Sequence, residues 1–340
     1  MRIALDATYS VGRNLSGVGV YSRQILAGLP AAHPDHRYLF CFRPHRFLRG
    51  LELAAPRNAS RTLLWKNWPF NVGLFHGLNQ RVDRRYKRVV TTFHDLFVMT
   101  GEYSTPEFRA RFAQQARLAA ERSDLIVAVS AFTAGQVEDL LGIPKSRIRV
   151  VHHGVTQGST RSLLSKRTIL FVGAIQTRKN VVRLVQAFEQ TEPGWKLILA
   201  GSAGYGAEEV LRAIERSPRR ADIRIPGYVT TEALEELYRT ASIFAFPSLD
   251  EGFGMPLLEA MVHGIPVLTS NSSALAEIAG RAALLVDPHS TSAIADGLDE
   301  LMRNDELRQN LGTQGIARSA EFSWGKTIEK TWSVYKELLD

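Results

Sequence analysis

The sequence predicts an α/β protein built from two doubly wound, parallel-sheet domains that face each other across a cleft. Strand-like apolar runs alternate with helix-like segments in both halves of the chain, and a linker-like stretch separates the two series. Such alternation is typical of βαβ units, which place helices on both faces of a parallel sheet. The 340 residues also suffice for two domains, because a single hydrophobic core rarely grows that large.

The first half contains seven strand candidates and three helix candidates. The apolar runs that predict strands are 2–7, 38–42, 62–65, 73–76, 89–93, 125–129 and 148–151. Apolar residues with helix-compatible spacing cover 19–29, 107–122 and 131–141.

Residues 154–167 interrupt this pattern, because Gly, Ser and Thr cluster there and few side chains are apolar. That composition predicts a linker, and we place the domains at 1–158 and 159–323. The second series of strand candidates is 168–172, 196–200, 222–225, 243–246, 266–269 and 284–286, with helices between them. The last segment predicts an amphipathic helix with an apolar stripe at Trp324, Ile328, Trp332, Tyr335 and Leu339.

Composition indicates a soluble globular protein, with 45% apolar and 22% charged residues. The single cysteine, Cys41, excludes an internal disulfide and fits a reducing compartment. The chain begins with a strand candidate rather than a signal peptide, and no apolar run has the length of a membrane-spanning helix. We therefore expect a cytoplasmic protein.

Positive charge is concentrated in the first half of the chain. Residues 1–160 hold 22 Lys and Arg against 11 Asp and Glu, whereas the remainder holds 20 against 23. This asymmetry favours an anionic partner, and a peripheral contact with an anionic membrane or a lipid-diphosphate acceptor is the preferred interpretation. A merely solvated basic face is the alternative. A nucleic-acid partner is not expected, because no recognition module for DNA or RNA is present.

The most informative stretch runs from Glu251 to Glu259 and reads EGFGMPLLE. It follows the strand candidate 243–246, and Pro256 suits the first position of a helix. The backbone N–H groups of Leu257 and Leu258 would then be unpaired at a helix N-terminus, which favours phosphate. Glu251 in the loop and Glu259 in the first turn would face a sugar and a ribose. The stretch predicts a sugar-nucleotide clamp, although a glutamate in a first turn is also favoured without a ligand.

A second candidate follows the strand at 168–172. Gly173 would let the backbone approach a ligand, and Arg178 and Lys179 place two cations at a helix start. Cations oppose the dipole there, so a bound anion would explain them. A solvated charge pair is the alternative.

Weaker candidates lie at other strand ends. His94 and Asp95 follow a strand in the first half, where His94 would face the donor sugar. His76 and Asn79 follow another strand, and these two residues and Asp95 would line an acceptor site. Gly17 and Gly19 lack the spacing of a dinucleotide fingerprint and would keep a loop open. The segment Gly227–Val229 is a weak candidate for reading the edge of a nucleobase. His152 and His153 are paired but have no third metal ligand at a supporting spacing. The sequence contains neither a Walker loop nor an Asp-x-Asp clamp. We therefore expect a mechanism that needs neither metal nor cofactor.

Taken together, these motifs resemble the retaining glycosyltransferases of family 4, and bacterial mannosyltransferase-like members in particular. The resemblance covers almost the whole chain. It rests on Gly17–Gly19, His94-Asp95, His153-Gly154-Val155, Arg178-Lys179-Asn180, Gly227-Tyr228-Val229, the Glu251–Glu259 element and Phe322-Ser323-Trp324. The family implies the GT-B fold, two Rossmann-like domains, with the last helix, 324–340, packing back on the first domain.

The resemblance also implies roles for individual residues. Glu251 would hold the donor sugar's hydroxyls, Arg178 and Lys179 would stabilise the leaving diphosphate, and His94 would lie near the sugar; these four are the expected catalytic residues. The expected donor-binding residues are Gly17, Gly19, Gly173, Val229, Gly252, Phe253, Gly254, Met255, Pro256, Leu257, Leu258 and Glu259. One departure is Ala174, where many relatives carry an arginine.

The reaction implied is transfer of a hexose, with retention, to a glycan or lipid-diphosphate-linked acceptor in surface polysaccharide synthesis. GDP-mannose is the first donor expected, and UDP-glucose or another UDP-sugar is the alternative. Two other readings stay open: an epimerase or phosphorylase on the same fold, and a non-catalytic nucleotide-sugar binding protein.

Overall fold

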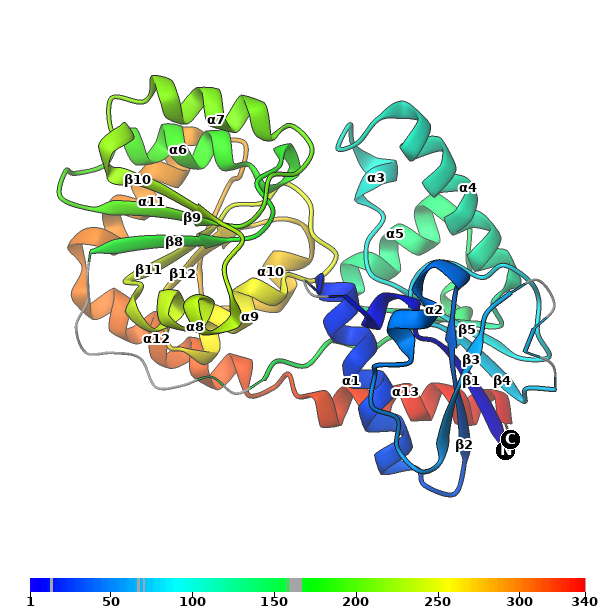
Figure 1. Cartoon of the computed structure of the whole chain (residues 1–340). Helices are drawn as coiled ribbons and strands as arrows, with labels where there is room; N and C mark the ends of the chain where they lie inside the picture. The colour runs from blue at the N-terminus through cyan, green and yellow to red at the C-terminus, as the bar shows by residue number, and fades with distance from the viewer. Residues whose placement is uncertain (13–14, 66–67, 70, 157, 159–166, 340) are drawn as a thin grey trace. The chain divides into compact units, whose positions relative to one another are not determined.

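The computed structural model describes residues 1–12, 15–65, 68–69, 71–156, 158 and 167–339, which form two compact units (Figure 1). Unit 1 comprises Met1–Gly154 together with Ser323–Asp340, and unit 2 comprises Val155–Phe322. The chain therefore leaves unit 1 once and returns to it for its last helix.

Unit 1 contains a parallel seven-stranded sheet in the order β3-β2-β1-β4-β5-β6-β7. Its strands are β1 (Arg2–Asp6), β2 (Arg37–Phe42), β3 (Ala59–Leu63), β4 (Leu74–Gly77), β5 (Val89–Phe93), β6 (Leu125–Ala128) and β7 (Ile148–Val150). Its α-helices are α1 (Gly17–Ala32), α2 (Pro44–Gly50), α3 (Phe97–Thr100), α4 (Pro106–Arg122), α5 (Ala131–Leu141) and α13 (Trp324–Leu339). The strand order reverses direction between β1 and β4, which makes this pair the switch point of the sheet.

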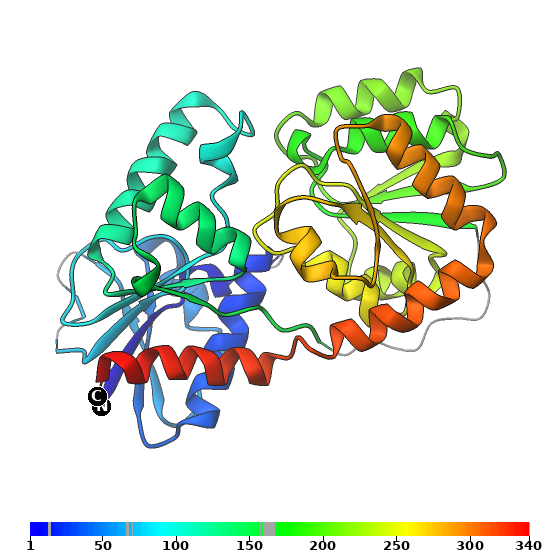
Figure 2. The same cartoon turned by 180° about the vertical axis from the view of Figure 1, so that it is seen from behind.

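Side chains of the unit 1 strands alternate between two cores. On one face Ile3 and Leu5 pack with residues of α1 and α13, and on the other Ala4 packs with residues of α4 and α5. This is the period-two alternation expected of strands covered on both faces. Helix α13 crosses α1 and packs against it (Figures 1 and 2), and a Cβ at Gly28 would meet Ile328 at 2.6 Å.

Unit 2 contains a parallel six-stranded sheet in the order β10-β9-β8-β11-β12-β13. Its strands are β8 (Thr168–Val172), β9 (Lys196–Ala200), β10 (Ile223–Gly227), β11 (Ile243–Phe246), β12 (Val267–Ser270) and β13 (Leu284–Val286). Its α-helices are α6 (Val181–Glu189), α7 (Ala207–Arg216), α8 (Thr231–Thr240), α9 (Met255–Val262), α10 (Ser273–Ala279), α11 (Thr291–Arg303) and α12 (Asp305–Ser319). The switch point of this sheet lies between β8 and β11.

The predicted fold class is confirmed, since both sheets are parallel, doubly wound and flanked by helices. The largest strand error concerns β3, predicted at 62–65 and observed at Ala59–Leu63. This edge strand exposes Ser60 and Arg61, so an apolar run does not mark it. Most of the predicted linker lies outside the described residues. No helix in the described part of the chain is both long and apolar enough to cross a membrane.

Candidate active site

A buried cluster of two cations and one carboxylate lies at the switch point of unit 2. Arg178 and Lys179 follow β8, and Glu251 follows the neighbouring strand β11. Arg178 Nη1 lies 2.9 Å from Glu251 Oε2, and Lys179 Nζ is ion-paired to Glu251 Oε1. All three residues are at most 8% exposed. The predicted cations and the first predicted glutamate are therefore in direct contact.

Hydrogen bonds fix the segment that carries the two cations. Residues Thr177–Lys179 form a 3₁₀ turn, and Asn180 then adopts a left-handed conformation with φ 59° before α6 begins. The Asn180 side chain donates to the carbonyl oxygens of Pro247 (3.0 Å) and Pro288 (2.7 Å). The Leu249 N–H donates to the Arg178 carbonyl at 2.9 Å. One main-chain hydrogen bond and the side chain of Asn180 thus hold the segment after β8 against the segment after β11.

The electrostatics of the cluster determine which chemistry Glu251 can perform. Burial alone would raise the pKa of Glu251, but the charges of Arg178 and Lys179 outweigh it and lower this pKa to about 2. Lys179 Nζ also lies 4.6 Å from the centre of the Phe246 ring, a cation–π contact. Glu251 is therefore ionised at neutral pH and cannot serve as a proton donor.

The loop after Glu251 leads into α9 with a geometry that differs in part from the prediction. Gly254 caps the helix with φ 98°, a conformation that favours glycine, and Pro256 occupies the second helical position rather than the first. The Leu257 N–H donates to the Gly254 carbonyl at 3.0 Å, so the expectation of an unpaired donor at Leu257 is wrong. An N–H group in the first turn of a helix can donate to the carbonyl of the capping residue through a 3₁₀-type hydrogen bond.

Glu259 lies in the second turn of α9, not the first, and its carboxylate has a specific partner. The Tyr238 hydroxyl donates to Glu259 Oε2 at 2.7 Å. Tyr238 stacks on His263 with ring centroids 5.3 Å apart, and His263 Nε2 lies 3.4 Å from Glu235 Oε2. Burial raises the pKa of Glu259, and the Tyr238 hydrogen bond opposes that rise. Sequence analysis missed Tyr238, because a tyrosine inside a helix pattern indicates core packing.

We expect Tyr238→Phe to raise the KM for the donor by about tenfold while kcat changes less. The variant removes one hydrogen bond to a charged group, which contributes roughly 1.5–3 kcal/mol, and keeps the ring stacked on His263. Glu259 would then be less well held for the ribose that we assign to it. Initial rates at varied donor concentration test this, and a donor with a 2′-deoxyribose should be affected less by the substitution. Equal KM increases for both donors would assign Tyr238 a structural role only.

Glycines end the strands next to the cluster. Gly173 follows the last residue of β8 and Gly227 is the last residue of β10, with positive φ values of 152° and 73°. Between them, a Cβ at Gly201 would lie 1.9 Å from the Gly173 carbonyl oxygen. Only glycine permits this approach of main chains. Val229 follows β10 and is half-buried, while Tyr228 before it is 55% exposed.

Unit 1 contains a buried group of aromatic rings at the end of β5. His94 Nε2 lies 2.9 Å from the Leu78 carbonyl oxygen, which only accepts hydrogen bonds, so this nitrogen carries the proton. His94 Nδ1 then accepts from His153 Nε2 at 3.3 Å, and Tyr21 packs against both imidazoles. Burial lowers the pKa of His94 to about 4 and lowers that of His153 as well. His94 is therefore a neutral ring and not a proton carrier at neutral pH.

His76 is fully buried within β4 rather than exposed at its end. Its Nδ1 lies 2.5 Å from the Tyr335 hydroxyl of α13, and its Nε2 lies 2.8 Å from Thr92 Oγ1 of β5. Burial lowers the pKa of His76 to about 3. The prediction that His76 lines an acceptor site does not fit this packing, because both ring nitrogens are occupied. The residue instead joins the last helix to the sheet.

The buried histidines predict that acid destabilises unit 1. A histidine whose folded pKa is depressed takes up its proton first in the unfolded chain, so stability falls as pH drops below about 6.5. For His94, with a pKa of about 4, the loss between pH 7 and pH 5 is roughly 2 kcal/mol. Urea unfolding followed by tryptophan fluorescence measures this, because four of the five tryptophans lie in unit 1.

His76→Gln should reduce the pH dependence of unfolding, whereas His289→Gln, an exposed site in unit 2, should leave it unchanged. Stability that is the same at pH 7 and pH 5 in the wild-type protein would refute the assignment of neutral buried imidazoles.

The other sequence-predicted residues of unit 1 lie at strand ends or in α1. Gly17 and Gly19 belong to the first turn of α1, so the prediction that they keep a loop open is wrong. Gly19 is needed for packing, since a Cβ there would meet the Tyr9 carbonyl oxygen at 2.9 Å. Asn79 and Asp95 are half-buried at the ends of the neighbouring strands β4 and β5. Their assignment to an acceptor stays a prediction.

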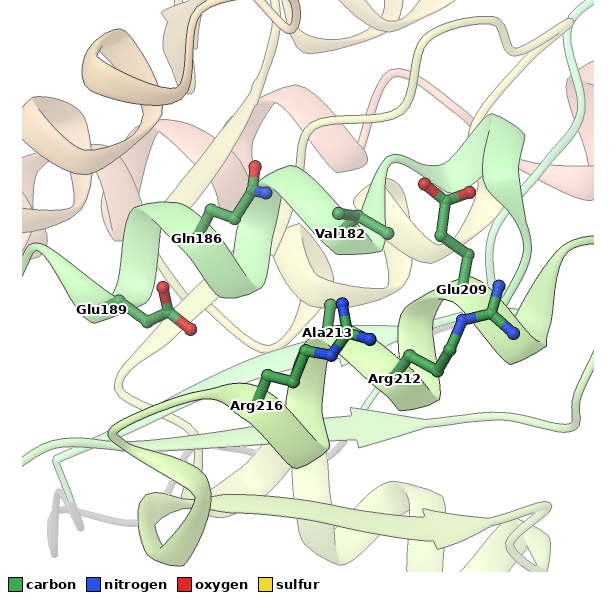
Figure 3. Close-up of a pocket in the computed structure, with 7 residues that line it drawn as sticks. All are labelled: Val182, Gln186, Glu189, Glu209, Arg212, Ala213 and Arg216. Atoms are coloured by element: carbon green, nitrogen blue, oxygen red, sulfur yellow. The ribbon is translucent and has the colours of Figure 1, made fainter.

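A groove of about 340 Å³ lies elsewhere on unit 2, between α6 and α7 (Figure 3). Its polar lining comes from Gln186 and Glu189 on α6 and from Glu209, Arg212 and Arg216 on α7. None of the sequence-predicted residues lies in it. Within the described residues, no group of three or more His, Cys, Asp and Glu side chains could hold a metal ion. Metal independence itself stays a prediction.

Similarity to known proteins shows the family of the chain. Its residues 158–318 match the family model for glycosyl transferases group 1, and residues 34–157 match the model for glycosyltransferase family 4. The fold and the matches define the class, a GT-B glycosyltransferase that transfers hexoses. The chain belongs to glycosyltransferase family 4.

Individual relatives show the extent of the similarity. The chain is 30% identical over 324 residues to O-antigen chain mannosyltransferase B of Escherichia coli, covering 89% of this chain and 84% of that protein. It is 28% identical to the serotype-specific mannosyltransferase WbdA of Escherichia coli over 74% of this chain, but it spans only 34% of WbdA. The structure of Anabaena HepE in complex with UDP and glucose superimposes with a TM-score of 0.77 at 16% identity, over 99% of this chain and all of HepE.

Proposed function

We propose that the chain is a retaining, metal-independent mannosyltransferase that uses GDP-mannose. The observation that carries this proposal is the buried Arg178–Lys179–Glu251 cluster at the switch point of unit 2, where ligands of doubly wound sheets bind. The mannosyltransferase relatives in O-antigen synthesis support the choice of sugar.

In this proposal unit 2 binds the donor. Arg178 presents a planar guanidinium and Lys179 a point charge, and both suit phosphate oxygens. Glu251, ionised and fixed between them, accepts hydrogen bonds from the sugar hydroxyls, and Glu259 accepts them from the ribose. The amide of Leu258 and the backbone of Gly252–Pro256 complete the donor site.

The reaction breaks the bond between the anomeric carbon and the β-phosphate oxygen and forms a bond from that carbon to an acceptor oxygen on the same face. The acceptor's proton passes to the departing phosphate, so the protein needs no general base. Negative charge accumulates on the diphosphate as the bond breaks, and fixed cations in a buried site stabilise it. His94 participates as a neutral ring that shapes the end of β5.

A UDP-sugar is the alternative donor, and the HepE complex with UDP and glucose supports it. We extend the proposal to an acceptor that is a glycan or is linked to a lipid diphosphate, reached at an anionic membrane surface, because 22 Lys and Arg against 11 Asp and Glu lie in residues 1–160.

A thermal-shift screen against GDP, UDP, ADP and their sugar conjugates, with and without EDTA, tests the donor. A nucleotide at about a hundred times its Kd stabilises the folded state by roughly 2.7 kcal/mol. A shift with guanine nucleotides that is insensitive to EDTA is the expected result. A shift with uridine nucleotides alone would replace the donor, and a shift that EDTA abolishes would overturn metal independence.

A further inference from the structure

A cationic pocket of about 220 Å³ lies at the switch point of unit 1, and none of the expected catalytic, donor-binding or acceptor residues lines it. Arg43 and Arg46 reach it from the segment after β2, and Arg81 reaches it from the segment after β4. The segment after β1 closes it from the third side. Since β1 and β4 are the pair at which the strand order reverses, this is where the fold positions a ligand.

Arg43 is the buried member of the pocket, with 6% of its surface exposed. Two of its nitrogens are ion-paired, one with Asp6 at 3.4 Å and one with Asp83. Its Nε is buried and has no hydrogen-bond partner among the described residues. Buried polar atoms normally have a hydrogen-bond partner, so the two carboxylates do not satisfy the Arg43 guanidinium completely.

The charges around the pocket do not cancel. Asp83 is shared, because Arg81 Nε also lies 3.0 Å from it. Three guanidiniums, those of Arg43, Arg46 and Arg81, therefore face two carboxylates, those of Asp6 and Asp83. Arg46 donates a long hydrogen bond of 3.4 Å to the Val11 carbonyl oxygen. An anion bound in the pocket would neutralise the remaining positive charge of the three guanidiniums.

The remaining lining favours a phosphate. His45 and the hydroxyl residues Thr8, Tyr9 and Ser16 also line the pocket and add polar groups around the guanidiniums. Arginine forks match the geometry of phosphate oxygens and bind them through two parallel hydrogen bonds. Such a pocket is small, polar and cationic, unlike the apolar pocket that an acyl chain would require.

We infer that this pocket binds a phosphate group of the acceptor, with Arg46 and Arg81 as its main ligands and Arg43 as the buried third. The inference rests on the proposed function, because the donor's diphosphate is assigned to Arg178 and Lys179 in unit 2. It identifies the acceptor as a phosphorylated molecule and gives the excess positive charge of residues 1–160 a specific role.

The experiment measures phosphate binding by calorimetry in a Lys179→Ala background, which weakens the donor site. The probes are inorganic pyrophosphate and geranyl diphosphate in neutral detergent micelles, with empty micelles as the blank. Arg46→Ala and Arg81→Ala should each weaken binding at least tenfold. Arg49→Ala is the matched control, because Arg49 lies on the same helix α2 as Arg46 but does not line the pocket.

Equal affinity for the two probes would support a soluble phosphorylated acceptor, and tighter binding of geranyl diphosphate would support a lipid-linked one. Unchanged binding in both Arg46→Ala and Arg81→Ala would overturn the inference. When Arg46→Ala is introduced alone, without Lys179→Ala, the variant should show the same donor-induced thermal shift as the wild-type protein. If the wild-type protein shows no donor shift, the proposed function fails, whereas loss of pyrophosphate binding in Arg46→Ala would still locate the anion site.

Discussion

Glu251→Gln should reduce sugar transfer to below about a hundredth of the wild-type rate, while nucleotide binding is retained. The amide cannot balance Arg178 and Lys179, both of which contact the carboxylate in the buried cluster. Removing one partner of a buried ion pair costs roughly 3–5 kcal/mol, because the remaining charges lose their counterion. A bound diphosphate would supply that missing negative charge. Nucleoside diphosphate should therefore stabilise the variant more than it stabilises the wild-type protein.

Initial transfer rates and melting temperatures with and without GDP measure these effects. Glu189→Gln, on α6 and outside the cluster, is the control and should behave as the wild-type protein does. A variant that transfers sugar at the wild-type rate would show that Glu251 has no part in the reaction, and our site assignment would then be wrong.

The second large effect is expected for Lys179→Ala, which should weaken nucleoside diphosphate binding at least tenfold and reduce kcat about a hundredfold. Lys179 is one of the two cations in the cluster and is held over the Phe246 ring. Its loss removes charge from the site where the leaving group becomes more negative. The free nucleoside, which lacks phosphates, should bind both proteins equally.

The comparison of nucleoside and nucleoside diphosphate by calorimetry separates this effect from a general loss of structure. Lys196→Ala is a suitable control, because Lys196 is an exposed lysine at the amino end of β9, away from the strand ends that carry the cluster. If Lys179→Ala weakened binding of the nucleoside as strongly as that of the diphosphate, Lys179 would be structural and not a phosphate ligand.

The sequence predicted the strands of both sheets well where they are buried on both faces. β5 and β8 follow the predicted ranges, because buried parallel strands are continuous apolar runs. The edge strand β3 was predicted to begin at residue 62 but begins at Ala59, and the short helix α2 was not predicted. Ser60 and Arg61 interrupt the apolar run of β3, and α2 is shorter than the windows in which helical periodicity is visible.

For the candidate site, the sequence identified Arg178, Lys179 and Glu251, but not that they contact one another. More than 70 residues of sequence separate Glu251 from the two cations. Their contact follows only from the strand order, which places β8 beside β11. His76 shows the opposite error. A histidine near a strand end suggested a ligand, but its partner, Tyr335, comes from the far end of the chain.

The pocket of unit 1 illustrates the same limit. Arg43, Arg46 and Arg81 were visible only as part of a general positive charge, because the segments after β2 and β4 become neighbours of the β1 segment only in the folded sheet. Tyr238 was equally hidden, since its hydroxyl meets Glu259 through the packing of α8 near α9.

In the reaction that we propose, fixed cations stabilise the leaving diphosphate, and the sugar is transferred with retention and without a metal. Proton NMR of donor hydrolysis by the wild-type protein in EDTA tests it most directly, with the sugar nucleotide that gives the largest thermal shift. We expect the sugar released first to have the anomeric configuration of the donor, at a rate that EDTA does not change. Release of the opposite anomer, or loss of turnover in EDTA, would contradict it.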